Sequence, residues 1–339
     1  MKKSIKRLAA AFLALSVLAG CSATPGVVQK NSTAPSVTES AAKSAFTDAV
    51  TVDGVQIGDE TVALGAEPAL SAGLKTVASG VLTQKNSKAV IDYSNTKDGY
   101  VMVKYTASTS QKLKVQVTGP SKTTYTYNIK AGGDWTTFPL SDGNGSYKVT
   151  VYENISGNKY ATVLSATFSV TLTDEFAPFL RSNQYVNFAD APKSVAKAAE
   201  LTKGMTDPLK KVKAVYSFVV TGFTYDKQKA SNLQSGYVSS LDSILGLKKG
   251  ICLDYAAMMA GMLRSQGVPC KLVVGYAGTA YHAWINVYSK DKGWINAAIY
   301  FDGKNWKLMD PTFASTANQS SEIMKYIGDG SHYTAKYLY

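Results

Sequence analysis

The chain has 339 residues, of which 45% are hydrophobic and 18% are charged, and its formal net charge is +12. This length corresponds to two domains of about 150 residues each, and the hydrophobic fraction excludes a chain that is disordered throughout. The basic charge favours anionic polymers or lipid headgroups as neighbours, rather than nucleic acid. A basic soluble surface with no particular partner is an equally good interpretation of the charge alone.

The N-terminus, "MKKSIKRLAAAFLALSVLAGCSA", predicts a signal peptide over residues 1–20. Basic residues precede an apolar run, Leu8 to Leu18, which is too short to span a bilayer comfortably. The run ends in "LAGC", which resembles the lipobox of bacterial lipoproteins. The resemblance implies that Cys21 carries lipid and anchors the protein to the membrane on the extracytoplasmic side. The alternative is ordinary secretory cleavage near Ala23, which would release the protein.

Removal of the signal leaves a basic chain. Four of the 36 basic residues lie within it, so 32 basic residues remain against 24 acidic ones, a charge of +8. Residues 21–45 are rich in Ser, Thr, Ala and Pro and predict a flexible tether. The pattern of residues 46–77 fits a strand or a short helix.

A β pattern covers residues 89–173. Short alternating or β-branched segments such as "YVMVKYTAS" and "KLKVQVTG" are separated by turn signals such as "GPSK" and "SDGNG". Evenly spaced short strands predict an immunoglobulin-like β-sandwich, and we assign it residues 46–180. Its exposed tyrosines suggest glycan or protein binding, but tyrosine on a half-buried strand is more often a packing residue.

A junction at residues 174–192 leads into a helical region, and we assign residues 181–339 to a second domain. Helices are predicted in the segments 194–207, with Gly204 near the end, in 207–226 and in 237–250.

The segment "GICLDYAAMMAGMLRSQG" predicts a helix with Cys252 in its first turn, on the same face as Ala256, Met259, Ala260 and Leu263. The N-terminus of a helix favours a thiolate and offers free N–H groups to an oxyanion. Lys248 and Lys249 would add positive potential, and Gly250 would permit a substrate to approach the backbone closely. The alternative is that Cys252 is a buried, inert core cysteine.

Two cysteines beyond Cys21 do not make a disulfide framework, and Cys270, which begins an apolar strand, is predicted to be a small core residue. His282 lies in the alternating strand "AYHAWINVY", as either a general base or a solvent-facing histidine. His332, in a polar stretch, is predicted to lie at the surface. Asp310 lies at the end of the short strand in "KNWKLMDPTF", on one face with Trp306 and Leu308. This strand is a candidate neighbour of the histidine strand, and Asp310 either orients the histidine or caps a turn.

"GICLDYAAMMAGMLRSQGVPCKLVVGY", "HAWINVY" and "DPT" resemble, in this order, the three blocks of the transglutaminase-like superfamily, which is related to papain-like proteases. The resemblance covers about residues 183–316. It implies Cys252 as the nucleophile, His282 as general base and acid, and Asp310 as the group that orients the imidazole. The fold that it implies is α+β, with the cysteine helix packed against an antiparallel sheet.

The resemblance also carries weaker implications: Tyr225 lines the site or helps the oxyanion, and Trp284 forms a cleft wall. Core packing is an equal alternative for both. The implied chemistry is acyl transfer from protein or peptide amides, including cell-wall peptides, through a cysteine thioester. Both a protease or amidase and a transglutaminase stay open, with hydrolysis slightly favoured. No metal or other cofactor is expected. The alternative function is a non-catalytic surface binding or scaffold lipoprotein.

Overall fold

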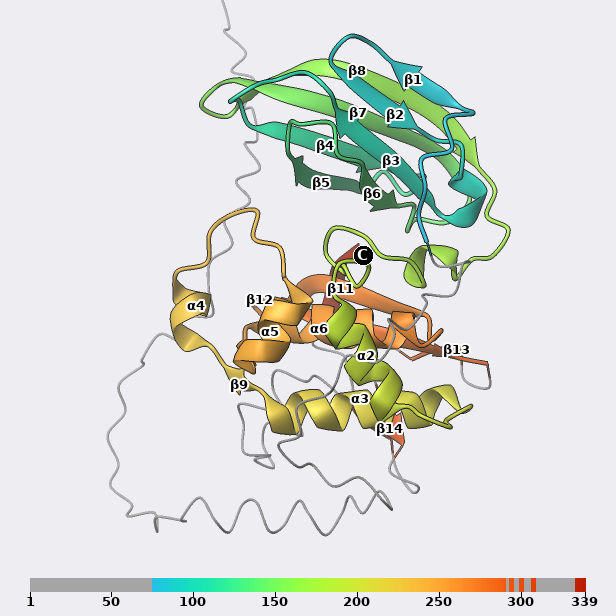
Figure 1. Ribbon diagram of the computed structural model, residues 1–339, viewed down its shortest axis with the longest axis vertical. Helices are drawn as coiled ribbons and strands as arrows, with labels where there is room; N and C mark the ends of the chain where they lie inside the picture. The colour runs from blue at the N-terminus through green and yellow to red at the C-terminus, as the bar shows by residue number, and fades with distance from the viewer. Residues whose placement is uncertain (1–74, 291–292, 296–298, 302–305, 309–332) are drawn as a thin grey trace, which may run out of the picture.

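The computed structural model describes residues 75–290, 293–295, 299–301, 306–308 and 333–339 (Figure 1). The predictions for the signal peptide, the tether, Cys21, Asp310 and His332 lie outside these residues.

The N-terminal half contains two four-stranded antiparallel sheets, drawn at the top of Figure 1. One has the order β1 (Thr83–Lys85), β2 (Ala89–Asp92), β3 (Tyr100–Tyr105) and β6 (Thr136–Pro139). The other has the order β5 (Thr124–Ile129), β4 (Leu113–Thr118), β7 (Gly145–Ser156) and β8 (Lys159–Val170). The short strands that the alternating segments predicted are therefore confirmed.

Alternation explains how these sheets bury their cores. Leu113, Val115 and Val117 of β4 are buried while the residues between them are half-exposed. Both sheets contribute to one apolar cluster, for example Val101 of β3 and Val149 of β7. The immunoglobulin-like type of this arrangement and the boundaries of the domain stay predictions.

The junction after β8 is packed. It contains the 3₁₀ helix η3 (Ala177–Phe179), and a second one, η2 (Thr96–Asp98), lies between β2 and β3. Arg181 donates from Nε to the carbonyl of Asp98 at 2.8 Å, and Val186 and Phe188 are buried. The chain thus enters the second half through a segment held to η2 of the first half.

The helices of the C-terminal half are α2 (Pro192–Leu201), α3 (Pro208–Gly222), α4 (Lys227–Ser231), α5 (Leu241–Leu247) and α6 (Cys252–Ser265). Asp207 caps α3 by accepting from the N–H of Leu209 at 2.8 Å, with Pro208 in the first turn. The predicted helices are confirmed, although α2 ends at Leu201, before Gly204. The sequence pattern did not separate α4 as an element.

An antiparallel sheet faces α6. Its order is β13 (Gly293–Ile295), β12 (Ala280–Ser289), β11 (Cys270–Ala277) and β16 (Tyr333–Leu338). Two further pairs are antiparallel β14 (Ile299–Phe301) with β15 (Trp306–Leu308) and parallel β9 (Thr224–Tyr225) with β10 (Lys249–Gly250). Strand β15 was predicted, and its described partner is β14 rather than the histidine strand β12.

Helix α6 is the centre of this half. It contacts β11 and β12 on one side and α2, α3 and α5 on the other, and every residue from Asp254 to Arg264 is buried. The prediction of one inward face was too narrow, because this helix is covered all round. Gly261 allows the contact with α5: a Cβ built there would lie 2.5 Å from Cδ1 of Leu241.

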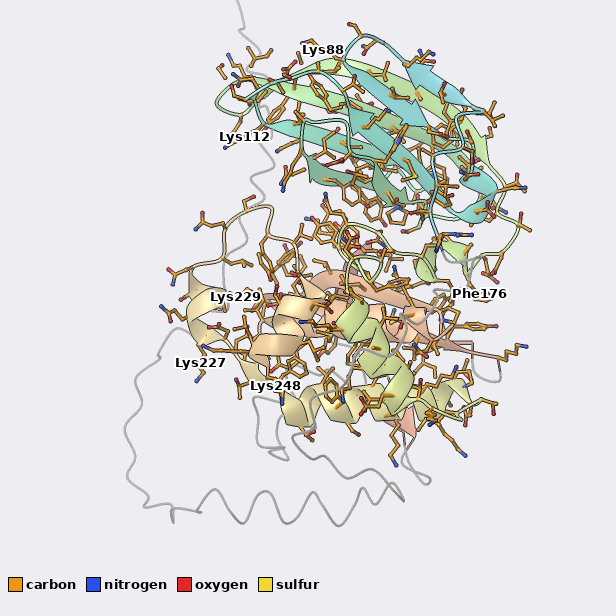
Figure 2. All side chains as sticks on the ribbon, viewed as in Figure 1. Lys88, Lys112, Phe176, Lys227, Lys229 and Lys248 are labelled. Carbon is orange, nitrogen blue, oxygen red and sulfur yellow. The ribbon has the colours of Figure 1, made fainter. Side chains whose placement is uncertain are left out.

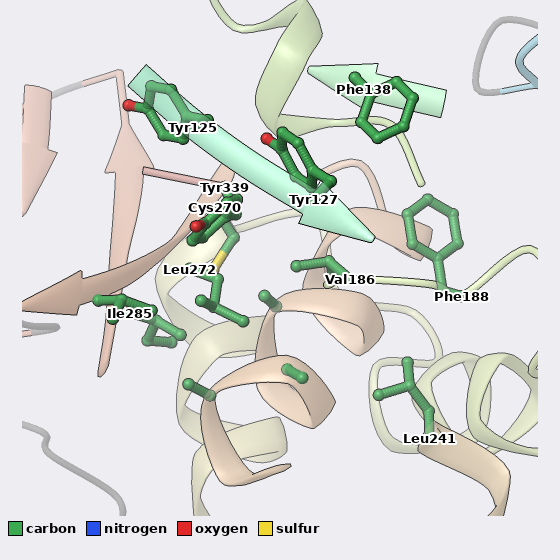
Figure 3. Packing of buried hydrophobic residues seen from close by; sticks show 14 of the residues in the cluster. Tyr125, Tyr127, Phe138, Val186, Phe188, Leu241, Cys270, Leu272, Ile285 and Tyr339 are labelled. Atoms are coloured by element: carbon green, nitrogen blue, oxygen red, sulfur yellow. The ribbon is translucent and has the colours of Figure 1, made fainter. Parts of the chain in front are cut away.

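The two halves meet through aromatic rings. Tyr125 and Tyr127 of β5 contact Tyr339, which follows β16, at ring-centroid distances of 5.6 and 5.9 Å (Figure 3). Tyr185 from the junction packs on Tyr339 at 4.3 Å. The buried apolar residues of both halves form one continuous cluster. The chain is therefore a mixed α+β protein whose halves share a core.

Candidate active site

Cys252 is the first residue of α6 and is partly exposed. Ile251, the N-cap, has extended backbone angles (φ −104°, ψ 177°). The first intrahelical bond runs from the N–H of Tyr255 to the carbonyl of Ile251 at 3.0 Å. The N–H groups of residues 252–254 therefore precede the helical bonding pattern and form the positive end of the helix dipole. The sequence prediction for the position of Cys252 is confirmed.

A short parallel strand pair aims the chain into α6. Tyr225 of β9 lies opposite Gly250 of β10, and the N–H of Asp226 donates to the Gly250 carbonyl at 2.8 Å. Lys248, which ends α5, adopts the left-handed conformation with φ 47°, so the chain reverses direction before β10. This pairing holds Tyr225 beside the backbone that leads to Cys252.

Gly250 has a different role from the one predicted. A Cβ built on it would lie 2.7 Å from Cβ of Asp254. The space that the missing side chain leaves is thus used by a buried aspartate of α6, and not by an approaching substrate. Glycine is required here for the packing of the first turn.

His282 lies in β12, opposite Gly275 of β11, and only 4% of it is exposed. Its ring stacks on Trp284 at 6.3 Å with an interplanar angle of 21°, and lies 6.4 Å from the ring of Tyr333. The alternative of a solvent-facing histidine is therefore wrong. The imidazole is therefore buried on the sheet and packed beside the rings of Trp284 and Tyr333.

Trp284 is buried, and its ring meets Tyr333 edge-on at 5.1 Å. A Cβ on Gly275 would clash with the Thr334 carbonyl oxygen of β16 and lie 2.9 Å from the Trp284 ring, so the glycine makes room for both. The structure places Trp284 behind His282, and the described pocket lining does not include it.

One pocket brings Cys252, His282 and Tyr225 together. It encloses about 760 Å³ of empty space, its open mouth included. The other residues of the lining are mostly apolar or aromatic: Tyr185, Ala230, Leu233, Gly236, Tyr237, Ile251, Leu253, Val274, Tyr281, Ala283 and Tyr339. The pocket thus joins the first turn of α6, the histidine strand and the β9 strand, which are remote in sequence.

Three tyrosines of this pocket, Tyr185, Tyr281 and Tyr339, have a raised pKa and stay protonated at neutral pH. Burial raises the pKa of Tyr281 to about 12, and neighbouring groups that include Tyr337 and Cys252 add to the shift. Burial likewise raises the pKa of Tyr185 and Tyr339. The pocket wall therefore presents neutral phenol groups, which can donate hydrogen bonds, around the sulfur.

Asp254 was missed in the sequence, although an acidic residue in the first turn of a helix is a typical capping signal. It is fully buried, and its carboxylate accepts from the N–H of Ile251 at 2.9 Å. It also accepts from Lys229 Nζ at 2.5 Å, from the Tyr237 hydroxyl at 2.6 Å and from Ser239 Oγ at 2.7 Å. Every partner except Ile251 comes from residues 227–240, which the periodicity of α6 cannot reveal.

Cys270, the second described cysteine, is a core residue, as predicted. Its side chain is fully buried among residues such as Leu272 and Ile285 (Figure 3). Burial raises the pKa of its thiol to about 12. A thiol in this setting stays protonated and unreactive at neutral pH.

Among the described residues, no group of three His, Cys, Asp or Glu side chains could hold a metal ion. None of the helices in this part of the chain is both long and apolar enough to cross a bilayer.

Residues 195–299 match the family model described as the transglutaminase-like superfamily. The match includes Cys252 and His282 and ends before Asp310. The chain therefore contains a transglutaminase-like domain. The matched region begins inside α2 and ends at the first residue of β14.

Two curated proteins are similar over shorter stretches. The uncharacterized protein YebA of Bacillus subtilis is 24% identical over 180 residues, 46% of this chain. A protein-glutamine gamma-glutamyltransferase of Pseudomonas aeruginosa is 29% identical over 69 residues, 16% of this chain. The matched regions span 24% and 10% of the lengths of these two proteins.

Among solved structures, a candidate cysteine protease from Cytophaga hutchinsonii aligns with a TM-score of 0.35 and 15% identity. The alignment covers 71% of this chain and 83% of the other.

Proposed function

We propose that the protein is a thiol acyl-transfer enzyme that acts on protein or peptide amides through a thioester on Cys252. The observation that carries the proposal is that one pocket is lined by a cysteine at the N-terminus of a buried helix and by a buried histidine on a neighbouring strand. A nucleophile, a base and free N–H groups are the parts that acyl transfer requires. Asp310 is the proposed group that orients His282.

The reaction begins when Sγ of Cys252, deprotonated by His282, attacks the amide carbonyl. The oxyanion that forms is stabilised by N–H groups in the first turn of α6, with Tyr225 as a further candidate donor. The C–N bond breaks as the histidine returns its proton to the leaving amine, and the acyl group stays on sulfur. An acceptor then attacks the thioester carbonyl as His282 takes its proton, the C–S bond breaks, and the proton returns to Sγ of Cys252.

The acceptor decides the activity. Water gives a protease or amidase, and a lysine amine gives a transglutaminase. The similarity to a protein-glutamine gamma-glutamyltransferase over 69 residues keeps transfer to an amine open. We retain hydrolysis as the slightly favoured outcome.

The proposed setting is the outer face of a bacterial membrane. A signal peptide over residues 1–20, a lipid on Cys21 and a tether to residue 45 would present the two domains, 46–180 and 181–339, at the cell surface. The first would be an immunoglobulin-like sandwich. Proteins or cell-wall peptides are then the accessible amides.

The test uses the mature chain and its Cys252→Ala variant with a cell-surface extract and a tagged primary amine. Incorporation of the tag that depends on Cys252 identifies transfer, and cleavage without incorporation identifies hydrolysis. Cys270→Ala is the matched control and should behave like the wild type. Extracts that do not change in a Cys252-dependent way would overturn the proposal and favour a binding or scaffold protein.

A further inference from the structure

Residues 226–240 form one wall of the pocket. They run from the end of β9 through α4 to the start of α5, and Ala230, Leu233, Gly236 and Tyr237 face the pocket. Between α4 and α5 this segment has no regular helix or strand, and several of its residues are exposed. We call it the wall segment.

The wall segment is fastened to α6 by a single carboxylate. Asp254 accepts hydrogen bonds from Lys229, Tyr237 and Ser239, all of which belong to the wall segment. Its remaining described bond goes to the N–H of Ile251, the N-cap of the helix that begins with Cys252. The same side chain therefore touches both the wall of the pocket and the start of the proposed nucleophile helix.

Charge makes this fastening strong. Asp254 is fully buried, and the Lys229 side chain, 28% exposed, forms its ion pair. Burial lowers the pKa of Lys229, but its bonds to Asp254 and Tyr237 outweigh this effect, so the pKa is raised overall. The ammonium also lies 4.3 Å from the centre of the Tyr237 ring. Loss of the carboxylate charge would leave the lysine without its counterion in a partly desolvated site.

Other contacts hold the ends and the tip of the wall segment. At the start, the N–H of Asp226 bonds to Gly250, and Lys249 pairs with the Asp226 carboxylate at 3.3 Å. At the tip, Gly236 lies against the Asn128 side chain of β5, with φ +83°. Figure 2 shows Lys227 and Lys229 on α4, at the edge of the C-terminal half. Asp254 is the anchor between these ends.

We propose that Asp254 is a positioning residue: it holds the wall segment against the pocket and thereby determines which acyl donors reach Cys252. The statement about acyl donors rests on the proposed function. The statement about the wall segment does not, because it concerns the folded chain alone.

The experiment compares Asp254→Asn with a matched control, Asp242→Asn. Asp242 of α5 also accepts several hydrogen bonds, from the N–H of Lys193 and from the N–H and hydroxyl of Ser194, and these hold α2 rather than the wall segment. Amide hydrogen exchange in the mature chain is measured over residues 227–240 and over α3. Asp254→Asn should speed exchange in the wall segment by about tenfold or more and leave α3 unchanged. Asp242→Asn should leave the wall segment unchanged.

A second readout follows access to the sulfur. Cys252 is alkylated with iodoacetamide and with a bulky biotin maleimide, and the ratio of the two rates is taken. Asp254→Asn should raise the relative rate of the bulky reagent at least threefold, and Asp242→Asn should not. A uniform rise of exchange across the whole chain, equal effects in the two variants, or an unchanged ratio would overturn the proposal.

If Asp254→Asn does not fold, Tyr237→Phe and Ser239→Ala remove one bond each while Asp254 stays in place. Both variants should speed amide exchange in the wall segment, and they should leave exchange in α3 unchanged. Unchanged exchange in both would contradict the proposal. If Cys252 is alkylated slowly in the wild type and in every variant, the proposed function is wrong. Amide exchange in the wall segment then decides the role of Asp254.

Discussion

The two ends of α6 each carry a buried charge and a nearby cysteine, but they are built differently. Asp254 near the N-terminus and Arg264 near the C-terminus both complement the helix dipole. Three of the four groups that bond to Asp254 are side chains of the wall segment, whereas Arg264 bonds to the backbone carbonyls of Cys270, Arg181 and Tyr339. The C-terminal end is locked into the core, and the N-terminal end is held by side chains beside a pocket.

The cysteines follow the same division. Cys252 is partly exposed to a pocket that also contains His282, while Cys270 is sealed in the core. The comparison indicates that the candidate reactive group lies at the N-terminus of α6, and that the C-terminal end of the same helix is held rigidly in the core. Arg264 and Cys270 should therefore matter for stability, and Cys252 for reactivity.

The largest expected loss of stability comes from Arg264→Met. The variant keeps an apolar stem but removes a donor from three backbone carbonyls, of which that of Tyr339 keeps the N–H of Leu272. Burial already lowers the pKa of this guanidinium to about 10. We expect the free energy of unfolding to fall by about 3–5 kcal/mol, measured by urea denaturation. Arg264→Lys keeps the charge but loses the planar set of guanidinium donors, so its free energy of unfolding should lie between those of the wild type and Arg264→Met. A loss below about 1 kcal/mol in Arg264→Met would show that Arg264 does not hold the C-terminal end of α6 in the core.

A smaller loss should follow Cys270→Ala. The thiol is fully buried, so its removal costs transfer energy and leaves a small cavity, about 1–2 kcal/mol. Cys252→Ala, at a partly exposed position, should cost less than about 0.5 kcal/mol. Thermal unfolding of the two variants side by side gives the comparison, and equal losses would contradict it.

The same thiol should make stability depend on pH in the alkaline range. Burial raises the pKa of Cys270 from 9.0 to about 12, so the folded chain keeps a proton that the unfolded chain releases. The contribution of this thiol to the free energy of unfolding is complete below pH 9. It is lost as the pH rises towards 12, by about 1.4 kcal/mol per pH unit. Urea unfolding between pH 8 and 10 should show a shallower decline for Cys270→Ala than for the wild type. Identical slopes would place this thiol outside the core.

The smallest effect is expected at the exposed lysines before α6. Lys249 is 47% exposed in its pair with Asp226, so Lys249→Ala should change the free energy of unfolding by less than about 0.5 kcal/mol. It should also change the alkylation rate of Cys252 by less than about twofold. A large change in that rate would assign to the lysine a role that we attribute to the helix and to His282.

Local patterns in the sequence predicted the elements well. Alternation located β4 and β7, the Asp207–Pro208 pair marked the start of α3, and the glycine before Cys252 marked the start of α6. These signals are short-range, and they need no knowledge of how the elements pack. That Cys252 and His282 share a site was implied by the resemblance to the transglutaminase-like superfamily, and not by a local pattern.

The missing features depend on packing between distant segments. The groups that bond Asp254 lie up to 25 residues away, and the hydrogen bond from Leu338 to the Tyr125 hydroxyl joins residues 213 apart. The burial of α6 on all sides arises from three helices and a sheet, so a single face could not reveal it. Gly250 was misinterpreted for the same reason, because its neighbour Asp254 faces it only after the helix has formed.

The most direct test of the central claim is the alkylation rate of Cys252 by iodoacetamide at pH 6, in the wild type and in His282→Ala. An ordinary thiol is almost fully protonated at this pH and reacts slowly. The account predicts that Cys252 reacts at least about tenfold faster in the wild type than in the variant, and that Cys270 stays unmodified in both native proteins. Equal rates for Cys252 in the two proteins, with the variant folded, would contradict the assignment of Cys252 and His282 as nucleophile and base.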